Sequence, residues 1–188
     1  MTLLIALNDI TDPRRNQAKR YQVSNLIFYS VLAILSNADS YRKIHTFIAT
    51  HLKLLKERFK LRWKKPPSYS TIRRAFLAVD PRELESIFRN FMRQFIDSDH
   101  RFIAIDGKTL RNSFDKFKDK EAIQILEVFL SAPNLIIAHE EFEADKTNEI
   151  PLAQSLIAEL GLEDKIVTLD ALHCQKKHLR RLESPITM

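Results

Sequence analysis

The stretch FIAIDGKTLR, residues 102–111, marks the point where the pattern of the sequence changes. Four mostly apolar residues run into a carboxylate, a glycine and a lysine, and the apolar run predicts a short buried strand ending at Asp106. Gly107 is one of only two glycines in the chain. Two interpretations of the Asp-Gly pair stay open. It is either a turn after a strand, or a carboxylate site that another backbone approaches closely.

Three more strands and one helix are predicted beyond this stretch. Short links between the first three strands favour antiparallel neighbours, and a strand that returns after a crossover helix should lie parallel to one already in the sheet. A glycine stands where the helix should stop. The segments are AIQILEVFLSA (122–132), NLIIAHEEFE (134–143), the helix NEIPLAQSLIAELG (148–161) and KIVTLD (165–170).

Two of the predicted strands end in an aspartate, Asp106 and Asp170. If these two strands lie side by side and parallel, both carboxylates reach the same edge of the sheet, where open sheets with helical crossovers place their chemistry. Neighbouring carboxylates repel each other and need a cation. Because oxygen ligands select hard ions, the pair predicts a site for Mg²⁺ or Mn²⁺.

Residues 16–96 have the apolar spacing of helices, with three to four residues between successive apolar positions. Two short helices near a tight turn are compatible with a helix-turn-helix, in which Arg73 and Arg74 on the second helix would contact DNA. A helical bundle with a basic outer face has the same pattern, so both interpretations stay open.

The last helix of this region has a strong start signal in the sequence DPRE. Asp80 is suited to the N-cap and Pro81 to the first helical position. Glu83 stands where it would complete a capping box with Asp80.

Charge is distributed unevenly along the 188 residues. Residues 1–100 hold 18 Lys and Arg against 9 Asp and Glu, whereas residues 101–188 hold 12 against 15, for a total of +6. A basic first half suggests a polyanion partner such as nucleic acid, and general solubility is the competing interpretation. The pattern also changes from helical to strand-like at DSDHR, residues 97–101, and we therefore expect two domains, 1–98 and 99–188.

Composition also excludes several classes of protein. The single cysteine, Cys174, rules out an internal disulfide framework and fits a reducing, cytoplasmic environment. No apolar run reaches the length of about 18 residues that a membrane-spanning helix needs. We therefore expect a cytoplasmic protein without a membrane partner.

Several strings resemble the motifs of the ISAs1-family insertion-sequence transposases, the group that includes the H-repeat-associated proteins. The resemblance covers most of residues 10–177, in the same order as in the family. PPSYSTIRRAFLAVDP is similar to the family's helical N-terminal region. The more specific strings are FIAIDGKTLRNSFDK, ADKTNEIP and IVTLDALHCQKK.

This resemblance implies a DDE transposase: an all-helical DNA-binding region followed by a ribonuclease-H-like catalytic domain of α+β class. In such enzymes three acids hold two divalent ions for in-line attack on a DNA phosphodiester. By position, Asp106 is the first acid and Asp170 the second, and both would bind Mg²⁺ or Mn²⁺. The implied partner is double-stranded DNA at the transposon ends, with self-association or pairing with an intact transposase.

The third acid of the family is a glutamate on a helix after a fifth strand, beyond the end of this sequence. The likeness fades after Lys177, so the resemblance predicts a copy truncated by a frameshift or an early stop, inactive, with weak or absent metal binding. The alternative is a non-catalytic DNA-binding remnant that occupies transposon ends or modulates an intact transposase. Lys108 and Arg111 would contact the phosphate backbone, or are solvated surface charges.

Overall fold

The chain folds into two compact units, residues 1–91 (the helical unit) and 92–188 (the sheet unit), each described here by itself. The boundary predicted between residues 98 and 99 lies outside the described residues. The computed structural model describes residues 2–96, 102–110, 123–131, 134–142, 149–162 and 165–169.

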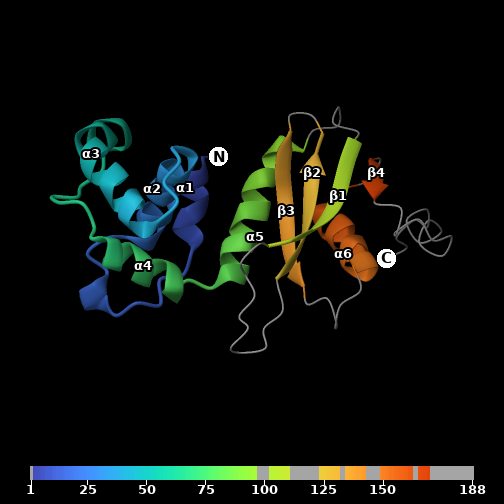
Figure 1. Ribbon diagram of the computed structural model, residues 1–188, viewed down its shortest axis with the longest axis horizontal. Coiled ribbons are helices and arrows are strands. Elements are labelled where there is room, and N and C mark those ends of the chain that lie inside the picture. Colours follow the sequence, from blue (N-terminus) through green and yellow to red (C-terminus); the bar gives the residue numbers. More distant parts are fainter. Residues whose placement is uncertain are drawn as a thin grey trace. The chain divides into compact units, whose positions relative to one another are not determined.

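The helical unit holds five α-helices and two short 3₁₀ turns, drawn in blue to green in Figure 1. The helical region predicted from the apolar spacing is therefore present. The final residue of α5 belongs to the sheet unit. The elements are α1 (Leu3–Ala6), η1 (Leu7–Asp9), η2 (Asn16–Ala18), α2 (Val23–Leu35), α3 (Tyr41–Phe59), α4 (Tyr69–Ala78) and α5 (Pro81–Met92).

Local signals in the sequence explain where α3 and α4 begin and end. Ser40 caps α3 and Ser68 caps α4, each accepting a hydrogen bond from the backbone N–H three residues on, at 3.3 and 3.2 Å. These bonds satisfy N–H groups that have no partner within the helix. Lys60 ends α3 in the left-handed conformation, with φ of 54°.

The start of α5 differs in one respect from the prediction. Asp80 does accept a hydrogen bond from the Arg82 N–H at 2.9 Å, as an N-cap should. The predicted capping box is wrong, because the Glu83 carboxylate accepts hydrogen bonds from the backbone N–H and the hydroxyl of Thr11, at 2.9 and 2.7 Å. A contact between residues 72 positions apart therefore takes the place of the local one.

One continuous apolar core holds the helical unit together. Its centre includes Leu26 and Ile48, neither of which is exposed to solvent. Four aromatic side chains pack edge to face at one side of this core, with ring centroids 5.0 to 5.8 Å apart. This geometry is the favoured one for aromatic pairs. The four are Tyr21, Tyr29, Phe59 and Trp63.

The sheet unit contains one mixed sheet with strand order β3-β2-β1-β4. β1 pairs antiparallel with β2, β2 antiparallel with β3, and β1 parallel with β4. Three antiparallel strands, a crossover helix and one parallel strand confirm the predicted α+β arrangement (Figure 1). Its described elements are η3 (Arg93–Phe95), β1 (Phe102–Thr109), β2 (Gln124–Leu130), β3 (Leu135–Phe142), α6 (Glu149–Leu160) and β4 (Ile166–Leu169).

β1 is longer than predicted. The sequence predicts a strand that ends at Asp106, yet β1 continues through Gly107, which pairs with Leu126, as far as Thr109, which pairs with Gln124. The turn interpretation of the Asp-Gly pair is therefore wrong. Hydrogen bonds of the backbone extend the antiparallel ladder, whichever side chains it carries.

β3 contains a bulge opposite the junction of Val128 and Phe129. Val128 pairs with Ala138 and Phe129 pairs with Ile136, so Ile137 has no partner of its own. Ile137 and Ala138 are consecutive and both fully buried. A bulge permits this, because the extra residue interrupts the alternation of faces along a strand.

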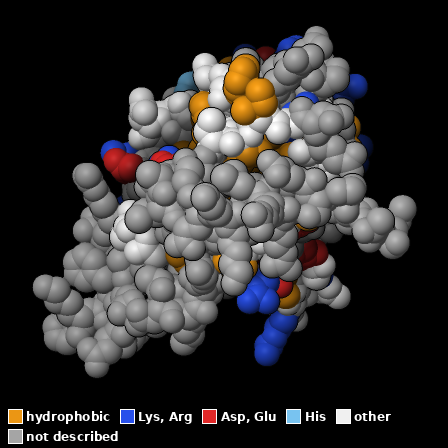
Figure 2. Space-filling model, turned by 90° about the vertical axis from the view of Figure 1, so that its right-hand side faces the viewer, with side chains coloured by type: hydrophobic (Ala, Val, Ile, Leu, Met, Phe, Trp, Pro, Cys, Tyr) orange, Lys and Arg blue, Asp and Glu red, His pale blue; other side chains and the backbone are white. Residues whose placement is uncertain are grey.

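Apolar side chains also reach the surface of the sheet unit. Phe102 and Ile166 face each other across the β1–β4 pair and are 56% and 52% exposed. Figure 2, turned so that the right-hand side of Figure 1 faces the viewer, shows hydrophobic side chains at the surface of the described part. Where the structure describes the chain, no helix combines the length and the apolar character that crossing a membrane requires.

Candidate active site

Asp106 lies inside β1, between two partner strands. On one side it is opposite Glu127 of β2 in the antiparallel ladder. On the other side the parallel pairing with β4 is described as far as Ile105, whose partner is Leu169. Ile103 and Ile105 are buried, whereas Asp106 is exposed. The alternation of strand side chains therefore anchors β1 through its isoleucines and turns the carboxylate to the solvent.

Lys108 shares the face of β1 that carries Asp106, because the two residues are two positions apart. Its ammonium group forms an ion pair with the Glu127 carboxylate, across the strand pair. The hydrogen bond to Glu127 is the main reason why the pKa of Lys108 is raised above 10.5. The charge of Glu127 adds to the rise, and Asp106 contributes less. The Lys108 ammonium therefore reduces the repulsion between the carboxylates of Asp106 and Glu127, which lie opposite each other in the ladder.

The Asp106 carboxylate itself has no hydrogen bond to another described residue. Oxygen ligands of this kind suit a hard cation such as Mg²⁺. Within the described ranges, no group of three or more His, Cys, Asp or Glu side chains is placed to hold a metal ion. The described part of the site thus offers one available carboxylate, at Asp106.

The other predicted site residues have different outcomes. Asp170 and Arg111 lie outside the described residues. Lys108 forms an ion pair with Glu127 and its side chain is 53% exposed, so both interpretations of its role stay open. Arg73 and Arg74 are both exposed on α4, and Arg74 donates a hydrogen bond from Nε to the Ser70 carbonyl at 3.2 Å. The predicted roles in binding DNA remain predictions.

Sequence reasoning missed Glu127. It lies within AIQILEVFLSA, where its apolar neighbours predict a strand and nothing else. The signal was a single charged residue in an apolar strand. Such a residue needs a partner when it is partly buried, and the Glu127 side chain is 22% exposed. Its partner, Lys108, is found only once β1 is known to extend past Gly107.

Comparisons with known proteins give consistent results over most of the chain. Residues 4–92 match the family model described as DDE_Tnp_1-associated. "H repeat-associated putative transposase YhhI" of Escherichia coli (strain K12) is 31% identical over 182 residues, which are 96% of this chain and 48% of that protein. "Putative transposase YncI" of the same strain is 33% identical over 169 residues, 89% of this chain and 67% of that protein.

The chain spans about half the length of the first curated relatives that it matches, 48% in the case of YhhI. Among solved structures, it is similar to a chain of the "piggyBac transposase synaptic complex with hairpin DNA". That likeness has a TM-score of 0.44 at 15% sequence identity, and covers 97% of this chain and 46% of the other.

Proposed function

Because the chain belongs to the ISAs1-type family of H repeat-associated transposases, we propose that it takes part in DNA transposition through a carboxylate site at Asp106 and Asp170. One observation carries the proposal. The parallel pairing of β1 and β4 is described up to Ile105 opposite Leu169, and an aspartate follows each of these residues in the sequence. Two strands of a ribonuclease-H-like sheet would then deliver both acids to one metal site.

In this proposal the residues of the chain bind and orient the reacting groups. Asp106 and Asp170 would hold Mg²⁺ or Mn²⁺, and such an ion would supply the charge needed to activate a water or a 3′-hydroxyl and to stabilise the leaving oxygen. The buried isoleucines of β1 keep Asp106 fixed on the sheet. The ion pair between Lys108 and Glu127 leaves Asp106 as the carboxylate that is available to a cation.

The substrate proposed is duplex DNA, namely the ends of the insertion sequence that encodes the chain. The helical unit would bind the duplex through its excess of Lys and Arg, and the acids of the sheet unit would act on a phosphodiester. The exposed Arg73 and Arg74 of α4 are candidates for contacts with the backbone, and so is Arg111. A salt-dependent affinity is expected, because binding releases the counterions of the phosphates.

A cleavage assay tests this proposal. Supercoiled plasmid that carries the DNA flanking the coding region is incubated with the purified chain, in Mg²⁺ or in EDTA. A metal site at the two acids predicts nicking in Mg²⁺ only, whereas the inactive copy that the resemblance also implies would nick in neither solution. We expect Asp106→Asn to lower the rate of nicking by at least about 100-fold, since even outer-shell partners of a metal contribute about 10- to 100-fold. Asp39→Asn, which changes an exposed acid of the helical unit, is the matched control and should retain the full rate.

Two results would contradict the proposal. Nicking that survives Asp106→Asn would place the chemistry elsewhere. Binding of the end-containing duplex without nicking in either Mg²⁺ or Mn²⁺ would leave a DNA-binding role and remove the catalytic one.

A further inference from the structure

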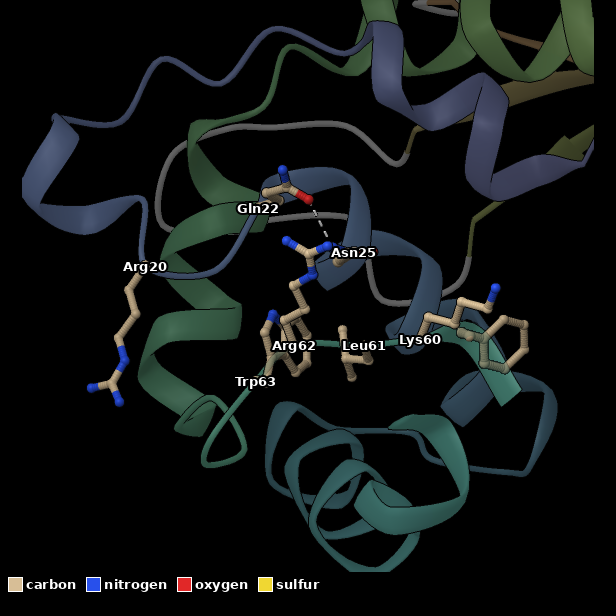
Figure 3. A pocket seen from close by; sticks show the side chains of 8 residues that line it. Arg20, Gln22, Asn25, Lys60, Leu61, Arg62 and Trp63 are labelled. Carbon is tan, nitrogen blue, oxygen red and sulfur yellow. Dashed lines mark hydrogen bonds between the residues drawn. The ribbon is translucent and has the colours of Figure 1, made fainter. Parts of the chain in front are cut away.

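A pocket of about 460 Å³ lies in the helical unit, apart from the candidate active site. Three cationic side chains line it, Arg20, Lys60 and Arg62. Figure 3 shows Arg62 directed toward the start of α2, with Arg20 and Lys60 on either side. These three residues therefore line a single recess, although Arg20 and Arg62 are 42 positions apart in the sequence.

The connector between α3 and α4 places two of these cations by simple alternation. Leu61 and Trp63 are buried, at 8% and 7% exposure, whereas Lys60, Arg62 and Lys64 are exposed. The Trp63 ring is held by edge-to-face contacts with two tyrosine rings, at 5.0 and 5.3 Å. The connector is thus anchored to the core by every second residue, and its cations are displayed by the others.

Lys60 also has an unusual backbone. Its φ of 54° is in the left-handed region, which glycine adopts freely and residues with a Cβ avoid. Strained conformations of this kind concentrate at functional sites, where the surrounding structure maintains them. A lysine at this helix end is less favourable for folding than a glycine would be.

The charges at the pocket are not neutralised within the protein. Among the described residues, no Asp or Glu forms an ion pair with Arg20, Lys60 or Arg62. Arg20 is placed over the ring of Tyr21, with its guanidinium carbon 5.7 Å from the centroid. Three like charges around one recess repel each other, and an anion between them would remove that repulsion.

Neutral donors at the pocket suit an anion as well. Gln22 and Asn25 line it, joined by a hydrogen bond of 2.9 Å from Asn25 Nδ2 to Gln22 Oε1 (Figure 3). Gln22 is the N-cap of the 13-residue helix α2 and makes no capping bond with its side chain. The first N–H groups of α2 are therefore left uncapped beside the cations, at the positive end of the helix dipole.

We propose that this pocket binds a phosphate of the DNA backbone. The inference rests on the proposed function for the identity of the polymer. Guanidinium groups and amides recognise phosphate oxygens by hydrogen bonds and by charge. The exposed Lys64 and Lys65 continue the positive charge along the connector past the pocket. This favours a chain of phosphates over a single free phosphate or nucleotide, which shares the same chemistry.

Fluorescence anisotropy with the full chain and a labelled 20-base-pair duplex tests the inference. We expect Arg62→Gln to weaken binding by about 5- to 10-fold in 0.1 M salt. It should also lower the slope of log affinity against log salt by about 0.9, as the loss of one phosphate contact does. Arg82→Gln, an exposed arginine of α5 that does not line the pocket, is the matched control and should bind more tightly than Arg62→Gln.

Lys60→Gly separates binding from folding. The variant removes a cation and relieves the strained backbone, so it should bind DNA more weakly while its Tm rises by about 2–6 °C. Weaker binding together with a higher Tm cannot come from a damaged fold. A Tm that rises while binding stays at the wild-type level would overturn the role of Lys60 in the pocket.

Three further results would overturn the inference in distinguishable ways. Pocket variants that bind the duplex as the wild type does would contradict the phosphate site and leave the proposed function intact. A wild-type chain that does not bind the duplex at low salt would contradict both the phosphate site and the proposed function. If inorganic phosphate or dAMP competes with the duplex at the affinity of the duplex itself, the pocket is a site for a small phosphate, and the polymer is the wrong ligand.

Discussion

The helical unit and the sheet unit place polar side chains in different ways. In the helical unit the apolar positions recur every three or four residues, and most of the cations are exposed, although the side chains of Arg14 and Arg89 are buried in ion pairs. In β1 every second side chain faces the core, so the exposed Asp106 directly follows the buried Ile105. A strand thus fixes a functional group close to its anchor, whereas the helical unit spreads its charges over a surface.

The two units also differ in net charge, which is positive in the helical unit and negative in the sheet unit. Residues 1–91 hold 17 Lys and Arg against 7 Asp and Glu, and residues 92–188 hold 13 against 17. A net charge of +10 in the first unit suits a polyanion partner, and −4 in the second suits a cation. This contrast agrees with the two roles proposed for them, and each of the following experiments probes one side of it.

The largest effect is expected in the core of the helical unit. Leu26→Ala removes a fully buried side chain and should lower the free energy of unfolding by about 2–5 kcal/mol. Trp63, the sole tryptophan of the chain, belongs to this unit and reports its unfolding by fluorescence in urea. Leu35→Ala, at a side chain that is 77% exposed, should change the stability by no more than about 0.5 kcal/mol. Equal effects of both variants would contradict the described core.

Ile103→Ala is the corresponding change in the sheet unit. Ile103 is fully buried, so the loss in that unit should again be about 2–5 kcal/mol, measured by hydrogen exchange of the β1 and β2 amides. The Trp63 transition should stay at its wild-type midpoint, because contacts divide the chain into two compact units. A common shift of both signals would show that the two units unfold as one.

A smaller effect on folding stability is expected at residues with positive φ. One substitution in the sheet unit should destabilise the fold, and one in the helical unit should not. Gly161→Ala places a Cβ at φ of 61°, with no atom within 4 Å, and should cost about 1 kcal/mol from the backbone alone. Asn37→Gly, at φ of 65°, should be neutral or stabilising by up to about 1 kcal/mol. Thermal unfolding measures both. Destabilisation by Asn37→Gly would mean that its side chain contributes more than its backbone costs.

Acid should weaken the helical unit by a modest amount through Asp12. Its carboxylate accepts hydrogen bonds from Nε and Nη2 of Arg14, at 2.8 and 2.7 Å. These hydrogen bonds are the largest cause that lowers the pKa of Asp12 below 3.8. A lowered pKa stabilises the fold above pH 3.8, and this contribution is lost as the pH falls through the lowered value. We expect about 1 kcal/mol or less. Urea midpoints between pH 6 and pH 3 should fall less for Asp12→Asn than for the wild type.

The smallest effect on stability is expected from a change at the partner of Lys108, where the main consequence is a shift in the pKa of Lys108. Glu127→Gln removes the hydrogen-bonded charge that raises this pKa, so the value should return toward 10.5 in an NMR titration of the lysine side chains. A raised lysine pKa adds stability at lower pH, and this is lost above about pH 10.5. An unchanged pKa in Glu127→Gln would mean that Asp106, and not Glu127, is the main partner of Lys108.

The sequence predicts the elements better than it predicts their contacts. Apolar spacing was sufficient for the helices, and the crossover rule predicted that β4 would be parallel to a strand already in the sheet, which the structure shows to be β1. The extension of β1 past Asp106 escaped prediction, because Asp and Gly are typical turn residues and the ladder depends on backbone atoms of β2. Glu83 formed a distant bond to Thr11 where a local capping box was predicted.

The candidate site was predicted in part for the same reason. Asp106 could be identified from its place after an apolar run, since one strand is enough to suggest it. Glu127 and the pocket around Arg62 depend on segments that meet only in the folded chain. No spacing within a single segment indicates which distant segments will come into contact.

The bulge in β3 makes one position in that strand tolerant of a change in length. Because Ile137 has no partner across the ladder, its deletion would leave every other residue of β3 opposite its present neighbour and on its present face, at the loss of one buried isoleucine. A deletion at Glu140, a regular position of β3, would instead move Glu141 into its place opposite the fully buried Leu126 and bring that charge toward the interior. Single-residue gaps between natural variants of this strand should therefore fall at Ile137.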